Sequence, residues 1–157
     1  MTATWRELPA AAREIALAAS EAVAAAQRRD PEEYDAAVAT LAAANGSGLI
    51  LGAVVRLLLE QTHPDGLDGD DIRAVLARAV RGAAEWQPTV DAHVMLVLLA
   101  GALGVYDPDD DEAPPDRGEL ARHAPLLVAD LLTGSGRPLA DYLTAAFAEV
   151  ERTERHD

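Results

Sequence analysis

Residues 88–104 read PTVDAHVMLVLLAGALG, and every residue from Val94 to Val105 is apolar or glycine. A helix built from such a run has no polar side, and a helix that is hydrophobic all round belongs inside a bundle. A membrane-spanning helix needs about 20 apolar residues, whereas this run is bounded by Asp91 and Asp107. We therefore expect 88–104 to form a buried central helix with amphipathic neighbours.

Six further segments have apolar residues at helical spacing, and no segment of useful length shows the alternation of a strand. Pro125, inside one of them, removes a backbone donor and predicts a kink near Arg122 or a division into two short helices. The sequence therefore predicts an all-α fold, a compact bundle of about seven helices around 88–104. The other six segments cover 8–29, 31–44, 49–61, 72–83, 117–131 and 138–150.

A weak internal repeat supports a second architecture. An apolar helix, an acidic turn with proline and an amphipathic helix occur in 49–80 and again in 90–131. The offset of roughly forty residues is close to the period of HEAT-type helix pairs. A short HEAT-like stack of paired helices is therefore the alternative to the compact bundle.

The length and composition are those of one domain without cysteine chemistry. A chain of 157 residues can bury a core of its own, so we expect a single helical domain over 1–157. Within it, we expect 1–6 to fray, 105–117 to form a mobile acidic loop and 151–157 to form a disordered tail. The absence of cysteine excludes disulfides and thiolate ligands. Arg6 and other charged residues interrupt any signal-peptide core, which predicts a cytoplasmic protein.

Charge is the strongest signal in the composition. The chain has 27 acidic and 13 basic residues, a net charge of −14, and every basic residue is arginine. A field of this sign repels the phosphate backbone of nucleic acids. We expect no nucleic-acid partner and no membrane partner, and the charge favours a basic protein as the partner. The oligomeric state stays open at this stage.

No motif in the sequence indicates catalysis, a cofactor or a metal site. His63, His93 and His123 do not form the close pair that zinc sites usually contain. The loop that starts at Asp107 has glutamate at its sixth position and Gly118 at its twelfth, where an EF-hand has glycine and glutamate. The sequence also lacks nucleophile elbows, P-loops and dinucleotide-binding glycine motifs. We therefore expect a non-enzymatic protein without catalytic residues, cofactor or metal.

Arginines gather on one face of the fourth predicted helix, which stands out in a chain of this charge. At about 100° per residue, three of them fall in a single outer sector. Guanidinium groups bind carboxylates and phosphates, and acidic loops attract basic surfaces. We therefore expect an adaptor, regulator or inhibitor that binds another protein through this face and the acidic loop. The expected partner-binding residues are Arg73, Arg78, Arg81, Asp109, Asp110 and Asp111.

The alternative function is a small-molecule sensor, because the interiors of helical bundles often hold ligand pockets. Such a pocket for an apolar ligand would lie near the start of the central helix. A sizeable cavity there would support the sensor, and a close-packed interior would exclude it. The residues expected to line the pocket are Trp86, His93 and Met95.

Overall fold

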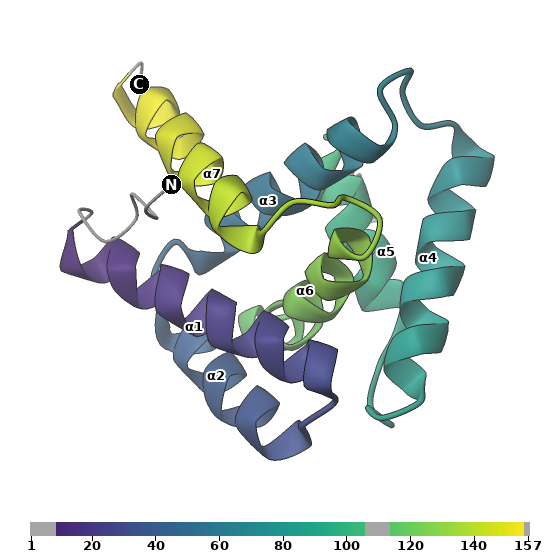
Figure 1. The fold of residues 1–157 in the computed structure, drawn as a ribbon, viewed down its shortest axis with the longest axis horizontal. Coiled ribbons are helices and arrows are strands. Elements are labelled where there is room, and N and C mark those ends of the chain that lie inside the picture. Colours follow the sequence, from purple (N-terminus) through teal and green to yellow (C-terminus); the bar gives the residue numbers. More distant parts are fainter. Residues whose placement is uncertain (1–8, 106–113, 156–157) are drawn as a thin grey trace.

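The computed structural model describes residues 9–105 and 114–155, which form seven helices and no strand (Figure 1). The all-α fold expected from the apolar spacing is confirmed. The helices are α1 (Ala10–Arg28), α2 (Pro31–Ala43), α3 (Ser47–Thr62), α4 (Gly69–Ala84), α5 (Ala92–Ala102), α6 (Arg117–Leu132) and α7 (Leu139–Arg155).

Aspartate side chains cap the starts of four helices. Each accepts a backbone N–H from the first turn at 2.8 to 3.2 Å, and such a cap contributes roughly 1 kcal/mol. Because the cap of α5 is Asp91, this helix begins at Ala92 and not at Pro88, the start expected from the sequence. The caps are Asp30 (α2), Asp68 (α4), Asp91 (α5) and Asp116 (α6).

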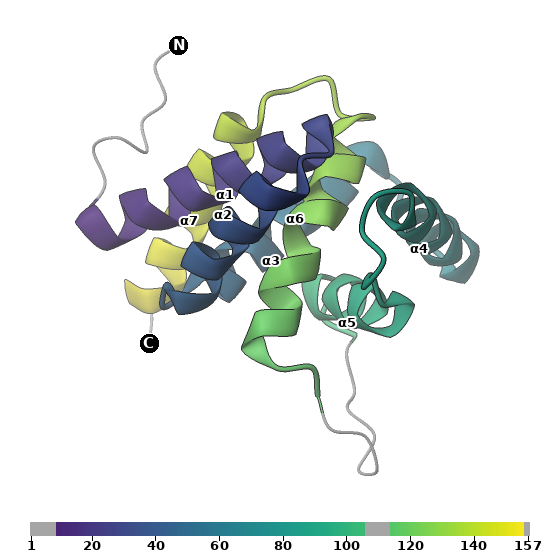
Figure 2. The same cartoon turned by 90° about the horizontal axis from the view of Figure 1, so that it is seen from below.

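The most enclosed helix is α6. It packs against α1, α2, α3, α4 and α5, and Figure 2 shows it between the α1–α2 pair on one side and α4 and α5 on the other. Its sequence is less apolar than that of α5, yet its buried side is covered from several directions. Its buried residues are Ala121, His123, Ala124, Pro125, Leu126, Leu127, Val128, Ala129 and Leu131.

The position of α5 differs from the buried central helix expected at 88–104. Of its 11 residues only Val94, Met95 and Leu99 are buried, and Leu96 is 41% exposed. Its substantial contacts with other helices are those with α3, α4 and α6. It lies at the edge of the molecule (Figure 2). An apolar pattern reports which side chains avoid water, but it does not report how many neighbours a helix has.

Pro125 lies inside α6, which continues through it as one helix. The expected division into two short helices is therefore wrong. The missing N–H of proline disturbs the carbonyl groups of the preceding turn. The hydroxyl of Tyr34 on α2 donates a hydrogen bond to the carbonyl of Arg122 in that turn. This bond supplies a partner for the helix backbone next to the proline and ties α2 to α6.

The last helix extends further along the chain than expected. The sequence predicts a disordered tail from 151, but α7 continues to Arg155 and packs mainly on α3. The expected frayed start at 1–6 lies outside the described residues, as does most of the expected loop at 105–117. The two halves of the weak sequence repeat correspond to α3–α4 and α5–α6.

In the ranges that the structure describes, no single helix is long and apolar enough to cross a membrane. The pair α2 and α3 reaches that length only when the two are taken together, and they are bent by 114° at the turn between them. The apolar helix α5 has only 11 residues.

Candidate functional site

The outward side of α5 leaves apolar side chains in contact with water. Leu96 is 41% exposed, Val105 just after the helix is 64% exposed, and Val97 and Leu98 are half-buried. Fully burying a leucine side chain contributes about 1.5–3 kcal/mol, and roughly two-fifths of that is not realised at Leu96. Exposed apolar side chains that gather on one surface often mark an interaction site.

A groove of about 690 Å³ lies between α3, α5 and α7, bounded also by the residues just before α6. We refer to it as the α3/α5/α7 groove. Its walls are aliphatic, contributed by Leu49, Val97, Leu98, Leu120 and Val150. Five other lining residues are glycine or alanine, namely Gly48, Gly52, Ala53, Gly101 and Ala102.

Three of these glycines face open space. A Cβ atom added at Gly48, Gly52 or Gly101 would meet no atom within 4 Å. Gly52 and Gly101 lie inside helices, where glycine is less favourable than alanine by roughly 0.5–1 kcal/mol. Packing within the chain therefore does not require glycine at these positions, and its presence leaves the groove wide.

An ion-pair network forms the polar part of the same groove. Arg56 of α3 donates to Glu60 at 2.8 Å and pairs with Glu149 of α7. Burial by itself lowers the pKa of Arg56, but the hydrogen bonds and negative charges of Glu60 and Glu149 more than offset it, so the pKa lies above its ordinary value. One cation beside two carboxylates leaves this part of the groove with excess negative charge.

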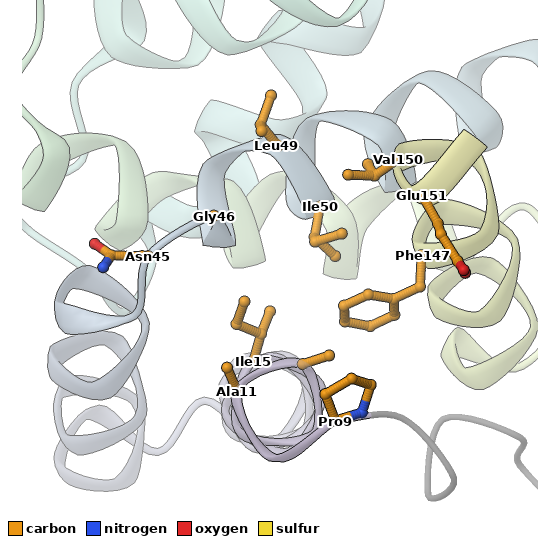
Figure 3. A pocket seen from close by; sticks show the side chains of 11 residues that line it. Pro9, Ala11, Ile15, Asn45, Gly46, Leu49, Ile50, Phe147, Val150 and Glu151 are labelled. Atoms are coloured by element: carbon orange, nitrogen blue, oxygen red, sulfur yellow. The ribbon is translucent and has the colours of Figure 1, made fainter. Parts of the chain in front are cut away.

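A second groove, of about 440 Å³, lies between α1, α3 and α7, and we refer to it as the α1/α3/α7 groove. Figure 3 shows Ile15, Ile50 and Phe147 converging on it from the three helices. Leu49 and Val150 line both grooves, and Figure 3 shows Leu49 turned away from Ile15 and Phe147. Leu49 is 66% exposed, so the two grooves meet at an exposed apolar side chain. We call the two grooves together the apolar face.

An acidic stretch of the sequence precedes Pro114, a residue that lines the α3/α5/α7 groove. Residues 106–113, which include the expected partner-binding residues Asp109, Asp110 and Asp111, lie outside the described part of the chain. The segment joins Val105 to Pro114, and Pro114 lines the groove. Its eight residues include five acidic side chains and no basic one. The chain connectivity therefore places a strong negative charge within a few residues of this groove.

The three arginines expected to bind a partner all lie exposed on α4 and line neither groove. Arg73 pairs with Asp70 at 2.5 Å, one turn away on the same helix. The Nε of Arg78 donates to Asp130 of α6 at 3.0 Å. Carboxylates of the same chain therefore pair with the guanidinium groups of Arg73 and Arg78. The third guanidinium group on this face belongs to Arg81.

Among the described residues, no cavity that we find is lined by more than one of the residues expected to line a ligand pocket. Met95 is fully buried, His93 is exposed, and neither lines any of the grooves that we describe. The half-buried ring of Trp86 packs edge-on against Tyr34, with ring centres 5.3 Å apart. Trp86 precedes α5, and the late start of this helix places His93 in its first turn, before the helix enters the core.

His123 is a buried polar residue whose role the sequence does not indicate. Its Nδ1 lies 2.7 Å from the carbonyl of Glu119, and its Nε2 accepts the backbone N–H of Asp91 at 2.9 Å. The ring therefore carries its proton on Nδ1 and joins the starts of α5 and α6. Both nitrogens are engaged, so this histidine has no free position for a metal or a proton transfer. Across the described ranges, no three histidine or carboxylate side chains gather as metal ligands would.

The grooves are the main feature that the sequence analysis did not anticipate. The available signal was glycine inside apolar helices, at Gly52 and Gly101. Glycine inside a helix has several explanations, so the pattern indicates a groove only once the neighbouring helices are placed.

Comparison of the chain with protein-family models, with curated proteins and with solved structures finds no match. The functional assignment therefore depends on the two grooves, the side chains that line them and the charge around them.

Proposed function

We propose that this is a non-enzymatic interaction protein that binds another protein at the apolar face. The single observation that carries the proposal is the exposed, aliphatic α3/α5/α7 groove, left open by glycines inside two helices. A partner that filled it would bury side chains that remain in water in the free chain. Binding to a partner protein is also what the sequence predicts. The proposed main contact is the apolar face and not the arginines of α4.

Leu49 illustrates the energy available for binding. The side chain is 66% exposed and stands where the two grooves meet. Burying a fully exposed leucine contributes about 1.5–3 kcal/mol, so covering Leu49 would contribute roughly 1–2 kcal/mol. A few such residues are enough for a specific interface, because most of the binding energy usually comes from a small central cluster.

The acidic charge favours a basic partner. The net charge of −14 steers basic surfaces toward the protein and repels acidic ones. The acidic residues between Val105 and Pro114, including Asp109, Asp110 and Asp111, would contact the partner beside the groove. The sensor function has no comparable support, because Trp86, His93 and Met95 do not line a common cavity.

The test compares three immobilised proteins exposed to lysate of the source cells. The first is the wild type, the second carries Leu49→Asp, and the third carries Leu17→Asp as a matched control. Leu17 is 49% exposed on α1 and lines neither groove, so this variant introduces the same charge away from the apolar face. Circular dichroism confirms that both variants keep the helical fold.

We expect a protein that is retained in stoichiometric amount by the wild type and by Leu17→Asp, and lost with Leu49→Asp. Mass spectrometry identifies it. Equal retention by all three proteins would place the interface elsewhere, and retention of no protein by any of them would remove the support for an interaction function.

A further inference from the structure

We infer that the α3/α5/α7 groove binds one amphipathic α-helix of the partner, with basic residues flanking its apolar side. The inference rests on the proposed function and specifies the kind of partner segment that the groove accepts. Three features lead to it: the small lining residues, the aliphatic walls and the net negative charge of the chain.

The small lining residues favour a helix as the occupant. Gly48 and Gly52 lie one turn apart on α3, and Gly101 of α5 lines the same groove. Helices that pack together have axes roughly 8–10 Å apart, and small residues at the contact allow the closer distances. A guest helix can therefore lie against both α3 and α5.

The aliphatic walls favour an amphipathic sequence on that helix. Leu49, Leu98 and Val150 come from three different helices and line the groove together. A guest helix presents apolar residues at intervals of three and four, which is the known arrangement when a helix binds in a groove. Its opposite side stays in water and carries polar residues.

The negative charge of the protein favours basic residues on the guest. The chain carries a net charge of −14. Within the groove, the positive charge of Arg56 is already compensated by Glu60 and Glu149. The net charge attracts lysine or arginine on the edges of a guest helix and repels glutamate or aspartate.

Two other occupants are less consistent with this charge. A second copy of the chain carries the same net charge of −14, and an anionic membrane surface is also repelled. Both are included in the test as outcomes that would overturn the inference.

The experiment uses fluorescence anisotropy with labelled model peptides of about 18 residues, or roughly 27 Å of helix. The first peptide has leucine at helical spacing and lysine on the opposite side. The second replaces lysine with glutamate, and the third is the lysine peptide with a central proline, which disfavours the helix.

Two protein variants separate binding in the groove from general attraction. Gly52→Leu fills the groove without meeting any atom within 4 Å of its Cβ. Gly82→Leu is the matched control, because Gly82 also lies inside a helix, also has no atom within 4 Å of an added Cβ, and does not line this groove. Both variants are checked for helix content and unfolding temperature.

We expect the lysine peptide to bind the wild type and Gly82→Leu equally, and Gly52→Leu at least about tenfold more weakly, a loss of about 1.4 kcal/mol. The glutamate and proline peptides should bind at least about tenfold more weakly to the wild type. Binding that is equal in both variants, or equal for the three peptides, would overturn the inference. So would dimers in sedimentation, or binding to vesicles that contain anionic phosphatidylserine, that Gly52→Leu abolishes.

The outcome also separates this inference from the proposed function. If the lysate partner depends on Leu49 but no model helix binds, the interaction function stands and the helical occupant is wrong. If the lysate experiment retains no partner and the peptides also fail, both proposals fail.

Discussion

Replacing Gly52 with alanine should make the protein more stable, although the residue lies in the middle of an apolar helix. Gly52 is an interior residue of α3, and a Cβ atom added there meets no atom within 4 Å. Alanine is more favourable than glycine in a helix interior by roughly 0.5–1 kcal/mol, and no clash reduces that gain. For a chain of this length the corresponding rise in unfolding temperature is about 1 to 4 °C.

Differential scanning calorimetry of three single variants measures the effect. Gly82→Ala should raise the unfolding temperature by a similar amount, because Gly82 is also an interior helix residue with open space around it. Gly46→Ala should lower it, since Gly46 has a φ of +89°, which is unfavourable for alanine. If Gly52→Ala lowered the temperature while Gly82→Ala raised it, part of the chain would fill the groove in solution, and the reasoning would be refuted.

Other predictions concern the contacts that hold α6 in place. Burial raises the pKa of Tyr34 well above its ordinary value, so the folded protein keeps a proton that the unfolded chain loses. Stability should therefore fall above about pH 10, and urea unfolding of Tyr34→Phe should show a shallower fall. At neutral pH the same variant should lose about 1–2 kcal/mol, because the carbonyl of Arg122 loses its partner; an unchanged unfolding midpoint would contradict this. His123→Ala should cost about 2–3 kcal/mol and speed amide exchange in the first turn of α5, and unchanged exchange there would show that the histidine does not hold that helix. Arg78→Ala should change stability by less than about 1 kcal/mol, because Arg78 is exposed in its pair with the partly buried Asp130; a larger loss would assign the arginine a structural role.

Helix existence and several helix starts could be predicted from the sequence because they depend on local chemistry. The pattern of Asp30 and Pro31 indicates a capped start, and the structure places the cap there. The sequence predicts a start at Pro88, but Thr89 and Asp91 are both residues that can cap a helix, and the backbone uses Asp91. Local propensity does not decide between two adjacent caps; the bond from Asp91 N–H to His123 adds a long-range preference.

The centre of the fold depends on long-range packing, which the sequence pattern does not report. The run around Leu96 is the most apolar in the chain, yet Leu96 is 41% exposed. Pro125 suggests an interrupted and peripheral segment, yet it is buried in the most enclosed helix, where Tyr34 supplies a hydrogen bond to the neighbouring backbone. Hydrophobicity measures the avoidance of water, whereas the number of surrounding helices depends on how the whole chain folds.

The candidate site shows the same limit more strongly. The arginines of α4 could be placed on one face from their spacing, but their carboxylate partners include Asp130, which is distant in sequence. The α3/α5/α7 groove brings together α3, α5 and α7 with Pro114, and no local pattern predicts that combination. The sequence signal for the groove is Gly52. Packing within the chain does not require glycine at this position inside a helix, so the glycine needs another explanation.

Photo-crosslinking in the source cells tests the central claim most directly. A photoreactive amino acid replaces Leu49 in one variant and Leu17 in a matched control, since both residues are exposed leucines and only Leu49 lines the apolar face. Binding at the apolar face predicts one crosslinked species of defined mass from position 49 and none from position 17. The same species from both positions, or no species from position 49, would contradict it.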